Sequence, residues 1–219
     1  MLRIAVLASG RGSNLQALID AIGAGQLDAT IAGVFSDKAD ALALQRARRA
    51  QIPALAVNPG DFRNRLGFDE HMFSAVDAVQ PDVIVFAGYM RLVSQREVDA
   101  RAGCVLNIHP SLLPAFKGLR THDQALAAGV SEHGASVHVV SADLDAGPVI
   151  AQARVPVLAG DDAATLGQRV IAREHPLLVQ TLRWLAAGRI KLTATSVEVD
   201  RVALAAPLQL GADNRLEIQ

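Results

Sequence analysis

Short runs of aliphatic residues alternate with segments of helical periodicity along the first half of this chain. The run at residues 82–87 has the near-continuous hydrophobicity of a strand that is covered on both faces. Alternation of this kind implies right-handed βαβ units, so the sequence predicts an open, doubly wound, mostly parallel α/β sheet. The predicted strands of this half cover residues 2–8, 30–35, 52–57, 82–87 and 105–108, and the predicted helices cover 13–24, 39–50 and 69–79.

The pattern changes in the second half of the chain. Strands are expected at residues 135–140 and 149–157, joined by a loop rich in glycine and aspartate. A long helix is expected at 163–187 despite Pro176, and the tail from 190 to 219 reads as short strands and turns. Because no internal repeat or low-complexity linker interrupts the sequence, we expect one domain over residues 1–219, with a more irregular C-terminal part.

Composition narrows the classes of protein to consider. Hydrophobic residues make up 51% of the chain and aromatic residues 4%, which predicts an aliphatic core. The net charge of −1 and the lack of a basic run disfavour nucleic-acid binding. The apolar start is too short for a signal peptide and no segment is long enough to span a membrane, so we expect a soluble cytoplasmic protein. The single cysteine, Cys104, is expected to be a small buried hydrophobic residue.

A glycine-rich turn follows the first predicted strand and opens the first predicted helix. Gly10 and Gly12 allow a close approach of backbone, and Ser13 can cap the helix. Free amides and the helix dipole favour an anion there, phosphate above all. A dinucleotide site is the alternative, although the third glycine of that pattern would fall at Leu15, and Asp37 supplies the expected carboxylate. A simple tight turn remains the third possibility.

Polar side chains occur at the end of the predicted strand 105–108. Asn107 and His109 are two residues apart and therefore point the same way, at the edge where open α/β sheets bind ligands. An amide and an imidazole can together stabilise an oxyanion and move protons. Asp145, in a Gly/Pro turn, could orient His109, whereas the plainer interpretations are a hydrogen-bonded strand-end cap for His109 and an Asx turn for Asp145. No metal site is predicted, because His133 and His138 have no carboxylate at ligand spacing.

These motifs together resemble the phosphoribosylglycinamide formyltransferase family, within the 10-formyltetrahydrofolate-dependent formyltransferases. The resemblance runs in the family's order over roughly residues 2–190, and the pair IHPSLLP and LDAGPVI is its most specific part. It implies a Rossmann-like formyltransferase fold and transfer of a formyl group from 10-formyltetrahydrofolate to the amine of glycinamide ribonucleotide. No metal is implied, and the partners are these two small molecules, with the enzyme a monomer or homodimer.

The resemblance also assigns residues to roles. The catalytic trio falls on Asn107, His109 and Asp145, and Ser136 fits the family's small hydroxyl position. The ribonucleotide would be bound by Gly12, Ser13, Asn14 and Glu174, with Arg173 nearby. The folate would contact Met90, Arg91, Leu92, Val93, Asn107, Ser141 and Asp145, with Arg65 near its tail. The N-terminal half would therefore supply the phosphate site, and the C-terminal half would complete the folate and catalytic sites.

Three other functions fit parts of the sequence. A sister formyltransferase that acts on methionyl-tRNA or an amino sugar would normally append a C-terminal domain, and a tRNA enzyme should be basic. A formyltetrahydrofolate hydrolase would normally carry an N-terminal regulatory domain. A non-catalytic nucleotide-binding module would need only the glycine turn, but Asn107, His109 and Asp145 are all present.

Overall fold

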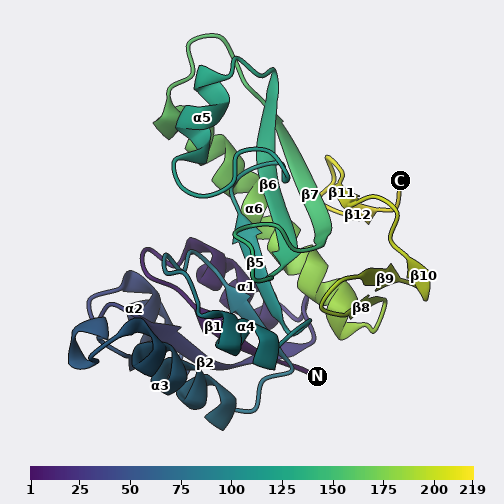
Figure 1. Ribbon diagram of the computed structural model, residues 1–219. Helices are drawn as coiled ribbons and strands as arrows, with labels where there is room; N and C mark the ends of the chain where they lie inside the picture. The colour runs from purple at the N-terminus through teal and green to yellow at the C-terminus, as the bar shows by residue number, and fades with distance from the viewer.

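The computed structural model describes residues 1–219 and is built around one nine-stranded sheet in the order β12-β11-β7-β6-β5-β4-β1-β2-β3 (Figure 1). Strands β3, β2, β1, β4 and β5 run parallel, and β6 enters antiparallel to β5 and β7. The mostly parallel α/β class predicted from the sequence is confirmed. The strands of this sheet are β1 (Leu2–Leu7), β2 (Ala29–Ser36), β3 (Ala54–Ala56), β4 (Val83–Phe86), β5 (Val105–His109), β6 (Glu132–Val139), β7 (Val149–Pro156), β11 (Leu208–Leu210) and β12 (Leu216–Glu217).

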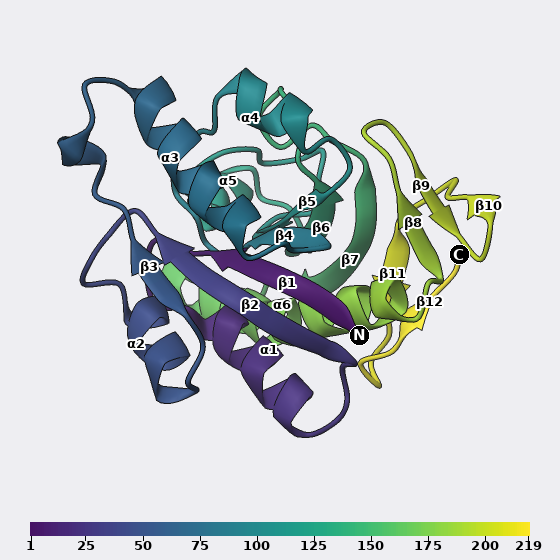
Figure 2. The ribbon, with the colours of Figure 1, turned by 90° about the horizontal axis from the view of Figure 1, so that it is seen from below.

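Helices cover both faces of the sheet (Figure 2). Alternate residues of β1 enter two separate cores, Ile4 and Val6 on the side of α1, α2 and α6, and Ala5 and Leu7 on the side of α3. This alternation is what a strand covered on both faces requires. The helices are α1 (Ser13–Gly23), α2 (Leu42–Arg49), α3 (Arg65–Ala78), α4 (Gln95–Ala100), α5 (Thr121–Ala127) and α6 (Ala163–Ala186), with a 3₁₀ turn η1 (Pro59–Asp61).

The strand order creates a crevice at the carboxyl edge of the sheet. From β1 the chain builds outward through β2 and β3, then returns to β4 on the other side of β1 and continues through β5. The loops that leave β1 and β4 therefore diverge, and open α/β sheets bind ligands at such a reversal. This topology brings the glycine turn after β1, the loop after β4 and the polar end of β5 to the same edge.

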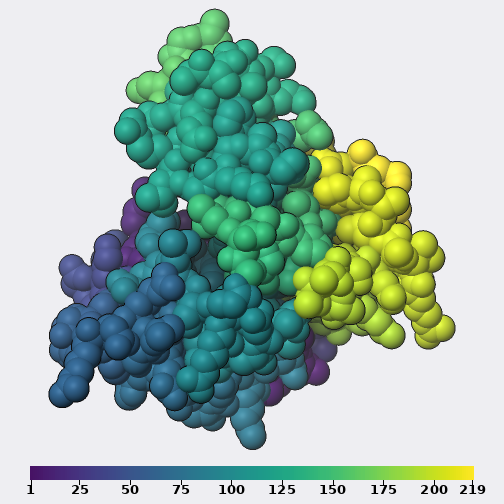
Figure 3. All heavy atoms as spheres, viewed as in Figure 1, coloured from purple at the N-terminus to yellow at the C-terminus, as the bar shows by residue number.

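The C-terminal tail forms two small structures. β8 (Ile190–Leu192), β9 (Val197–Val199) and β10 (Val202–Ala203) make a separate three-stranded sheet. β11 then pairs in parallel with β7 and extends the main sheet. In the space-filling view the tail, coloured yellow, lies at one side of the molecule (Figure 3).

The sequence missed or misplaced several local features. Helices α4 and α5 were not predicted, because each has only six or seven residues of mixed composition. Helix α3 begins at Arg65, four residues before the predicted start at 69, since Asn64 caps it through Gly67 N. Cys104 is exposed, so its predicted burial was wrong. None of the helices combines the length and apolarity that crossing a membrane demands.

Candidate active site

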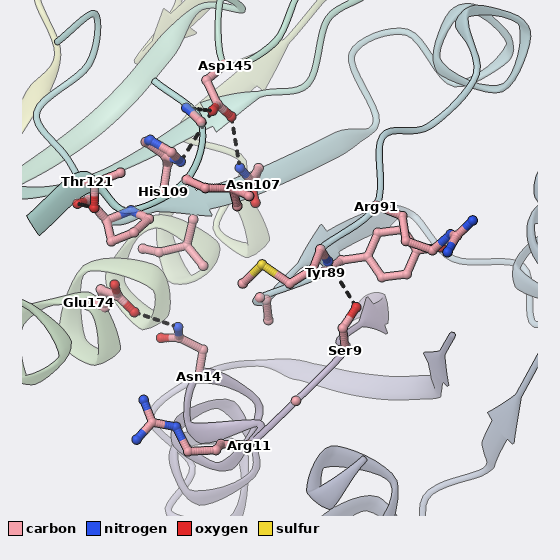
Figure 4. A pocket seen from close by; sticks show the side chains of 18 of the residues that line it. Ser9, Arg11, Asn14, Tyr89, Arg91, Asn107, His109, Thr121, Asp145 and Glu174 are labelled. Atoms are coloured by element: carbon pink, nitrogen blue, oxygen red, sulfur yellow. Dashed lines mark hydrogen bonds and ion pairs between the residues drawn. The ribbon is translucent and has the colours of Figure 1, made fainter. Parts of the chain in front are cut away.

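A cavity of about 940 Å³ opens at the carboxyl edge of the sheet (Figure 4). Its walls come from the turn after β1, the loop after β4, the end of β5, the loop that leads to α5, and α6. The residues predicted for function that line it are Gly12, Ser13, Asn14, Met90, Arg91, Leu92, Asn107, His109, Asp145 and Glu174. The structure therefore brings together side chains that are up to 162 residues apart in the chain.

The glycine turn at one end of the cavity is held by its packing. Gly12 is the N-cap of α1 with a left-handed φ of 69°, and an added Cβ would lie 2.7 Å from the Cα of Ala43. Glycine is required there by the backbone conformation and by contact with α2. Ser13 is the first helical residue and makes no capping hydrogen bond, so its predicted role as a cap was wrong. The amides of the first turn still lack intrahelical acceptors and face the cavity edge, which suits an anion.

A buried contact joins this turn to the long helix. Asn14 Nδ2 donates to Glu174 Oε2 at 2.8 Å, which links α1 to α6. Burial raises the pKa of Glu174, and the hydrogen bond from Asn14 offsets part of that effect. Asn14 Oδ1 is buried without a partner, beside the carboxyl group. The other carboxyl oxygen of Glu174 makes no hydrogen bond, and at the cavity wall it can accept one from a hydroxyl group of a ligand.

Arg173, the neighbour of Glu174, points elsewhere. Its guanidinium donates to the carbonyls of Leu210 and Gly211 at 3.0 and 2.7 Å, and to the side chain of Asn214. It does not line the cavity. The structure thus ties Arg173 to the tail and does not bring it to the predicted ribonucleotide site.

Asn107, His109 and Asp145 gather at the other end of the cavity (Figure 4). His109 Nδ1 lies 3.5 Å from Asp145 Oδ2, and Asn107 Nδ2 lies 3.5 Å from Asp145 Oδ1. Gly118 N donates to Asp145 Oδ2 at 2.9 Å. The turn that carries Asp145 needs glycine at 147, because an added Cβ would meet Val139 O at 1.9 Å. The trio predicted from separate segments is therefore one contiguous cluster.

Hydrogen bonding sets the protonation pattern of His109. Its Nε2 lies 3.0 Å from the carbonyl of Phe116, which can only accept, so the ring proton sits on Nε2. Nδ1 is then the nitrogen free to take a proton, with Asp145 beside it. Burial lowers the pKa of His109, while the Phe116 carbonyl and Asp145 partly offset this. Burial acts to raise the pKa of Asp145, but its contacts with His138, Gly118 and His109 bring it below the usual value.

His138 is a member of this cluster that the sequence reasoning missed. It pairs with Asn107 across the antiparallel β5–β6 ladder. Its Nδ1 lies 3.0 Å from Val139 O and so carries the ring proton, which leaves Nε2 to accept from Asn107 Nδ2 at 3.1 Å. His138 therefore fixes which way the Asn107 amide faces. The antiparallel register was the signal needed to find it.

Comparison with known proteins decides the family. The family model described as formyl transferase matches residues 2–182. The chain belongs to the formyl transferase family. It is 46% identical to phosphoribosylglycinamide formyltransferase of Escherichia coli (strain K12) over 91% of this chain and 94% of that protein. A solved phosphoribosylglycinamide formyltransferase from Coxiella burnetii has a TM-score of 0.89 and 46% identity, covering 93% of this chain and 96% of that one.

The resemblance predicted from the motifs is thereby confirmed, and the chain is a phosphoribosylglycinamide formyltransferase family member. A more distant solved relative is a formyltetrahydrofolate deformylase from Pseudomonas syringae pv. tomato, with 28% identity and a TM-score of 0.81. It covers 90% of this chain and 65% of that one. The scaffold of this formyl transferase is therefore shared with a deformylase.

The residues predicted for the folate of this formyl transferase, apart from Asn107 and Asp145, divide into four groups. Met90 and Leu92 expose their side chains to the cavity, at 66% and 60%. Arg91 turns its guanidinium onto the ring of Phe68, 4.7 Å away. Val93 and Ser141 line a smaller recess of about 110 Å³ that shares Asn107 and Asp145 with the main cavity. Arg65, at the start of α3, lines neither space.

Two other predicted features lie outside the cavity. Asp37, the carboxylate of the dinucleotide alternative, is buried after β2 and does not line the cavity. Ser136 is fully buried on β6, opposite His109 in the ladder. No three side chains among histidine, cysteine, aspartate and glutamate are grouped so that they could hold a metal ion.

Proposed function

We propose that this enzyme transfers the formyl group of 10-formyltetrahydrofolate to the amine of glycinamide ribonucleotide. The products are N-formylglycinamide ribonucleotide and tetrahydrofolate. The observation that carries the proposal is the layout of one cavity, with an anion-binding turn at one end and the amide, imidazole and carboxylate cluster at the other. A phosphorylated amine needs both ends, because one holds its phosphate and the other meets its reacting nitrogen.

The ribonucleotide lies along α1 and α6 in this proposal. Its phosphate binds the first-turn amides at Gly12, Ser13 and Asn14, where the helix dipole favours negative charge. The ribose hydroxyls donate to the carboxyl group of Glu174, which lines the cavity. This placement directs the glycinamide amine toward Asn107 and His109.

The folate lies against the loop after β4. Met90 and Leu92 offer apolar surface, and the backbone from 90 to 93 offers donors and acceptors to the edge of a pterin. Ser141 and Asp145 bound the recess beside it. Arg65 stays a prediction for the folate tail, since it lies outside both spaces.

The chemistry uses the cluster as a unit. The amine nitrogen bonds to the formyl carbon, and the bond from that carbon to the folate nitrogen then breaks. One amide hydrogen of Asn107 is donated to His138 Nε2, and the other makes only a long 3.5 Å contact with Asp145 Oδ1. The second hydrogen is therefore available to the developing oxyanion. Neutral His109 takes the amine proton on Nδ1, and Asp145 stabilises the imidazolium. The proton then passes to the departing folate nitrogen.

The proposed partners are small molecules only. We expect the enzyme to act in the cytoplasm, without nucleic acid, membrane or metal, as a monomer or a homodimer. The sister transferases and the hydrolase remain the alternatives. Among these alternatives, hydrolysis has one observation in its support, which is the 28% identical deformylase with the same fold.

One assay separates these functions. The enzyme is incubated with 10-formyltetrahydrofolate and, in parallel, with glycinamide ribonucleotide, its unphosphorylated riboside, an amino sugar, methionyl-tRNA or no amine. Release of tetrahydrofolate and formylation of each amine are measured. We expect fast turnover with the ribonucleotide alone. Equal release of tetrahydrofolate without any amine would establish hydrolysis and contradict the proposal.

A further inference from the structure

The loop at residues 110–120 supplies two backbone groups to the catalytic cluster. The carbonyl of Phe116 accepts from His109 Nε2 at 3.0 Å, and the amide of Gly118 donates to Asp145 Oδ2 at 2.9 Å. Phe116 and Arg120 adopt left-handed φ values of 54° and 57° in this loop. Non-glycine residues seldom hold such conformations unless the surroundings impose them. Something outside the loop must therefore fix its path.

Two buried side chains on the neighbouring strands fix that path. Gln152 on β7 donates to Leu113 O at 2.8 Å and to Ser136 Oγ at 3.0 Å. Ser136 on β6 accepts from Leu113 N at 3.0 Å and donates to Ser111 O at 2.7 Å. The loop is therefore held at both backbone polar atoms of Leu113, its N and its O. Leu113 lies three residues before Phe116, whose carbonyl accepts from His109.

The clamp continues along the loop toward the catalytic residues. Ser111 Oγ donates to Ala115 O at 2.7 Å, which closes the turn immediately before Phe116. Hydrogen bonds and the short stretches of chain between them therefore connect Gln152, through Ser136 and the turn, to the Phe116 carbonyl that accepts from His109. Gln152 itself lines neither of the two spaces described for the substrates.

We propose that Gln152 is a positioning residue for formyl transfer, which acts by placing Phe116 O and Gly118 N against His109 and Asp145. The expected change in kcat rests on the proposed function. The hydrogen bonds between Gln152, the loop and His109 do not depend on that function. If the clamp is lost, the Phe116 carbonyl moves and the Nε2 hydrogen of His109 loses its acceptor. Small displacements of catalytic groups reduce turnover far more than they reduce binding.

The test replaces Gln152 by methionine, which has similar length but no hydrogen-bonding group. We expect kcat to fall about 10- to 100-fold, with both KM values within about two-fold of wild type. The Phe116 carbonyl raises the pKa of His109, so its loss should move the acidic limb of the kcat profile to lower pH. Histidine ring ¹⁵N NMR of the free enzyme should show a changed hydrogen bond at His109 Nε2.

The matched control is Arg154→Met. Arg154 is two residues further along β7, on the same face, and makes only an exposed ion pair with Glu132 at 3.0 Å. It should leave kcat and the His109 spectrum unchanged, because exposed ion pairs contribute little. Turnover is compared at a temperature where circular dichroism shows each variant folded, so that lost stability does not count as lost catalysis.

A second variant, Gln152→Glu, keeps the proposal testable if the methionine variant fails to fold. A protonated glutamate can still donate to Leu113 O, whereas an ionised one cannot. Activity should therefore recover as pH falls, relative to wild type at the same pH. Wild-type kcat and an unchanged His109 spectrum in a folded Gln152 variant would overturn the proposal. Failure of the wild-type enzyme to formylate the ribonucleotide would instead overturn the proposed function and leave the NMR test standing.

Discussion

The two ends of the cavity are built in different ways. The ribonucleotide end, where we propose that the phosphate binds, consists mainly of backbone amides in one local turn, held by glycine at position 12 and by the packing of α2. The catalytic end, where we propose that the formyl group is transferred, consists of side chains from β5, β6 and the loop before β7, which meet only in the folded sheet. Ligand binding at the turn can therefore be changed mainly by replacing a glycine with a larger residue. The catalytic end can be changed by substitutions that remove one charged or hydrogen-bonding group.

The largest effect on activity is expected at Asp145. Asp145→Asn keeps the shape of the side chain but removes its charge, and loss of such stabilisation typically lowers kcat on the order of 100- to 1,000-fold. Asp145 raises the pKa of His109, so in the variant that pKa should fall and the acidic limb of the profile should move to lower pH. Steady-state kinetics across pH measure both effects. Near wild-type kcat would remove Asp145 from the proposed mechanism.

A double variant tests whether the catalytic end acts as a unit. Asp145→Asn combined with His109→Ala should be little worse than the worse single change, because both act on one proton path. The measurement is kcat together with the Kd of the ribonucleotide for each single and for the double. Losses that multiply as independent factors would contradict the shared path, even if both residues matter.

Gly10 and Gly12 provide a matched pair at the ribonucleotide end. An added Cβ at Gly10 meets nothing within 4 Å, whereas at Gly12 it would collide with Ala43. Gly10→Ala should leave stability unchanged and raise the ribonucleotide KM about ten-fold, because bulk enters the space of the phosphate. Gly12→Ala should lower the melting temperature as well. An unchanged KM in the folded Gly10 variant would contradict the phosphate assignment.

The glycine turn at the proposed ribonucleotide end could be predicted from the sequence alone, and the reason is locality. A strand, a glycine turn and a helix are adjacent in the chain, so Gly12 and Asn14 could be placed without knowledge of the fold. Asn107 and His109 could be paired by strand alternation alone. His138 and the Phe116 carbonyl could not, because an antiparallel register and a loop of left-handed residues bring them in.

Exposure and direction were also beyond the sequence at particular residues. Cys104 precedes the buried strand that begins at Val105 and is exposed, although its neighbours in the chain are apolar. Arg173 and Glu174 are adjacent on α6, yet one faces the tail and the other faces the cavity. Adjacent residues of an α-helix point about 100° apart, and the tail, which carried no recognisable motif, supplies the partners that hold Arg173.

A moderate effect is expected at His138, which orients the Asn107 amide. His138→Leu removes the acceptor, so the amide can rotate and kcat should fall roughly ten-fold, with little change in either KM. His138→Gln retains a carbonyl acceptor and should keep more of the activity. Both variants are measured by steady-state kinetics beside Asn107→Ala. Equal activity of the leucine variant and wild type would mean that Asp145 alone orients Asn107.

The smallest effect on activity is expected at Arg173, and its contrast with Glu174 tests the direction of each side chain. Arg173→Met removes hydrogen bonds to Leu210 O, Gly211 O and Asn214, so the free energy of unfolding should fall by about 1–3 kcal/mol. Its ribonucleotide KM should not change, because the side chain lies outside the cavity.

Glu174→Gln should raise the ribonucleotide KM and leave the stability of the fold almost unchanged, the opposite of Arg173→Met. The glutamine oxygen can still accept from Asn14, so the fold is preserved, but the carboxylate is lost where the ribose hydroxyls are proposed to bind. We expect an increase in KM of about ten-fold, with little change in unfolding. Denaturant titration and steady-state kinetics on the two variants separate the effects. A raised KM for Arg173→Met, without any raised KM for Glu174→Gln, would show that Arg173, with the tail it holds, contacts the ribonucleotide and that Glu174 does not.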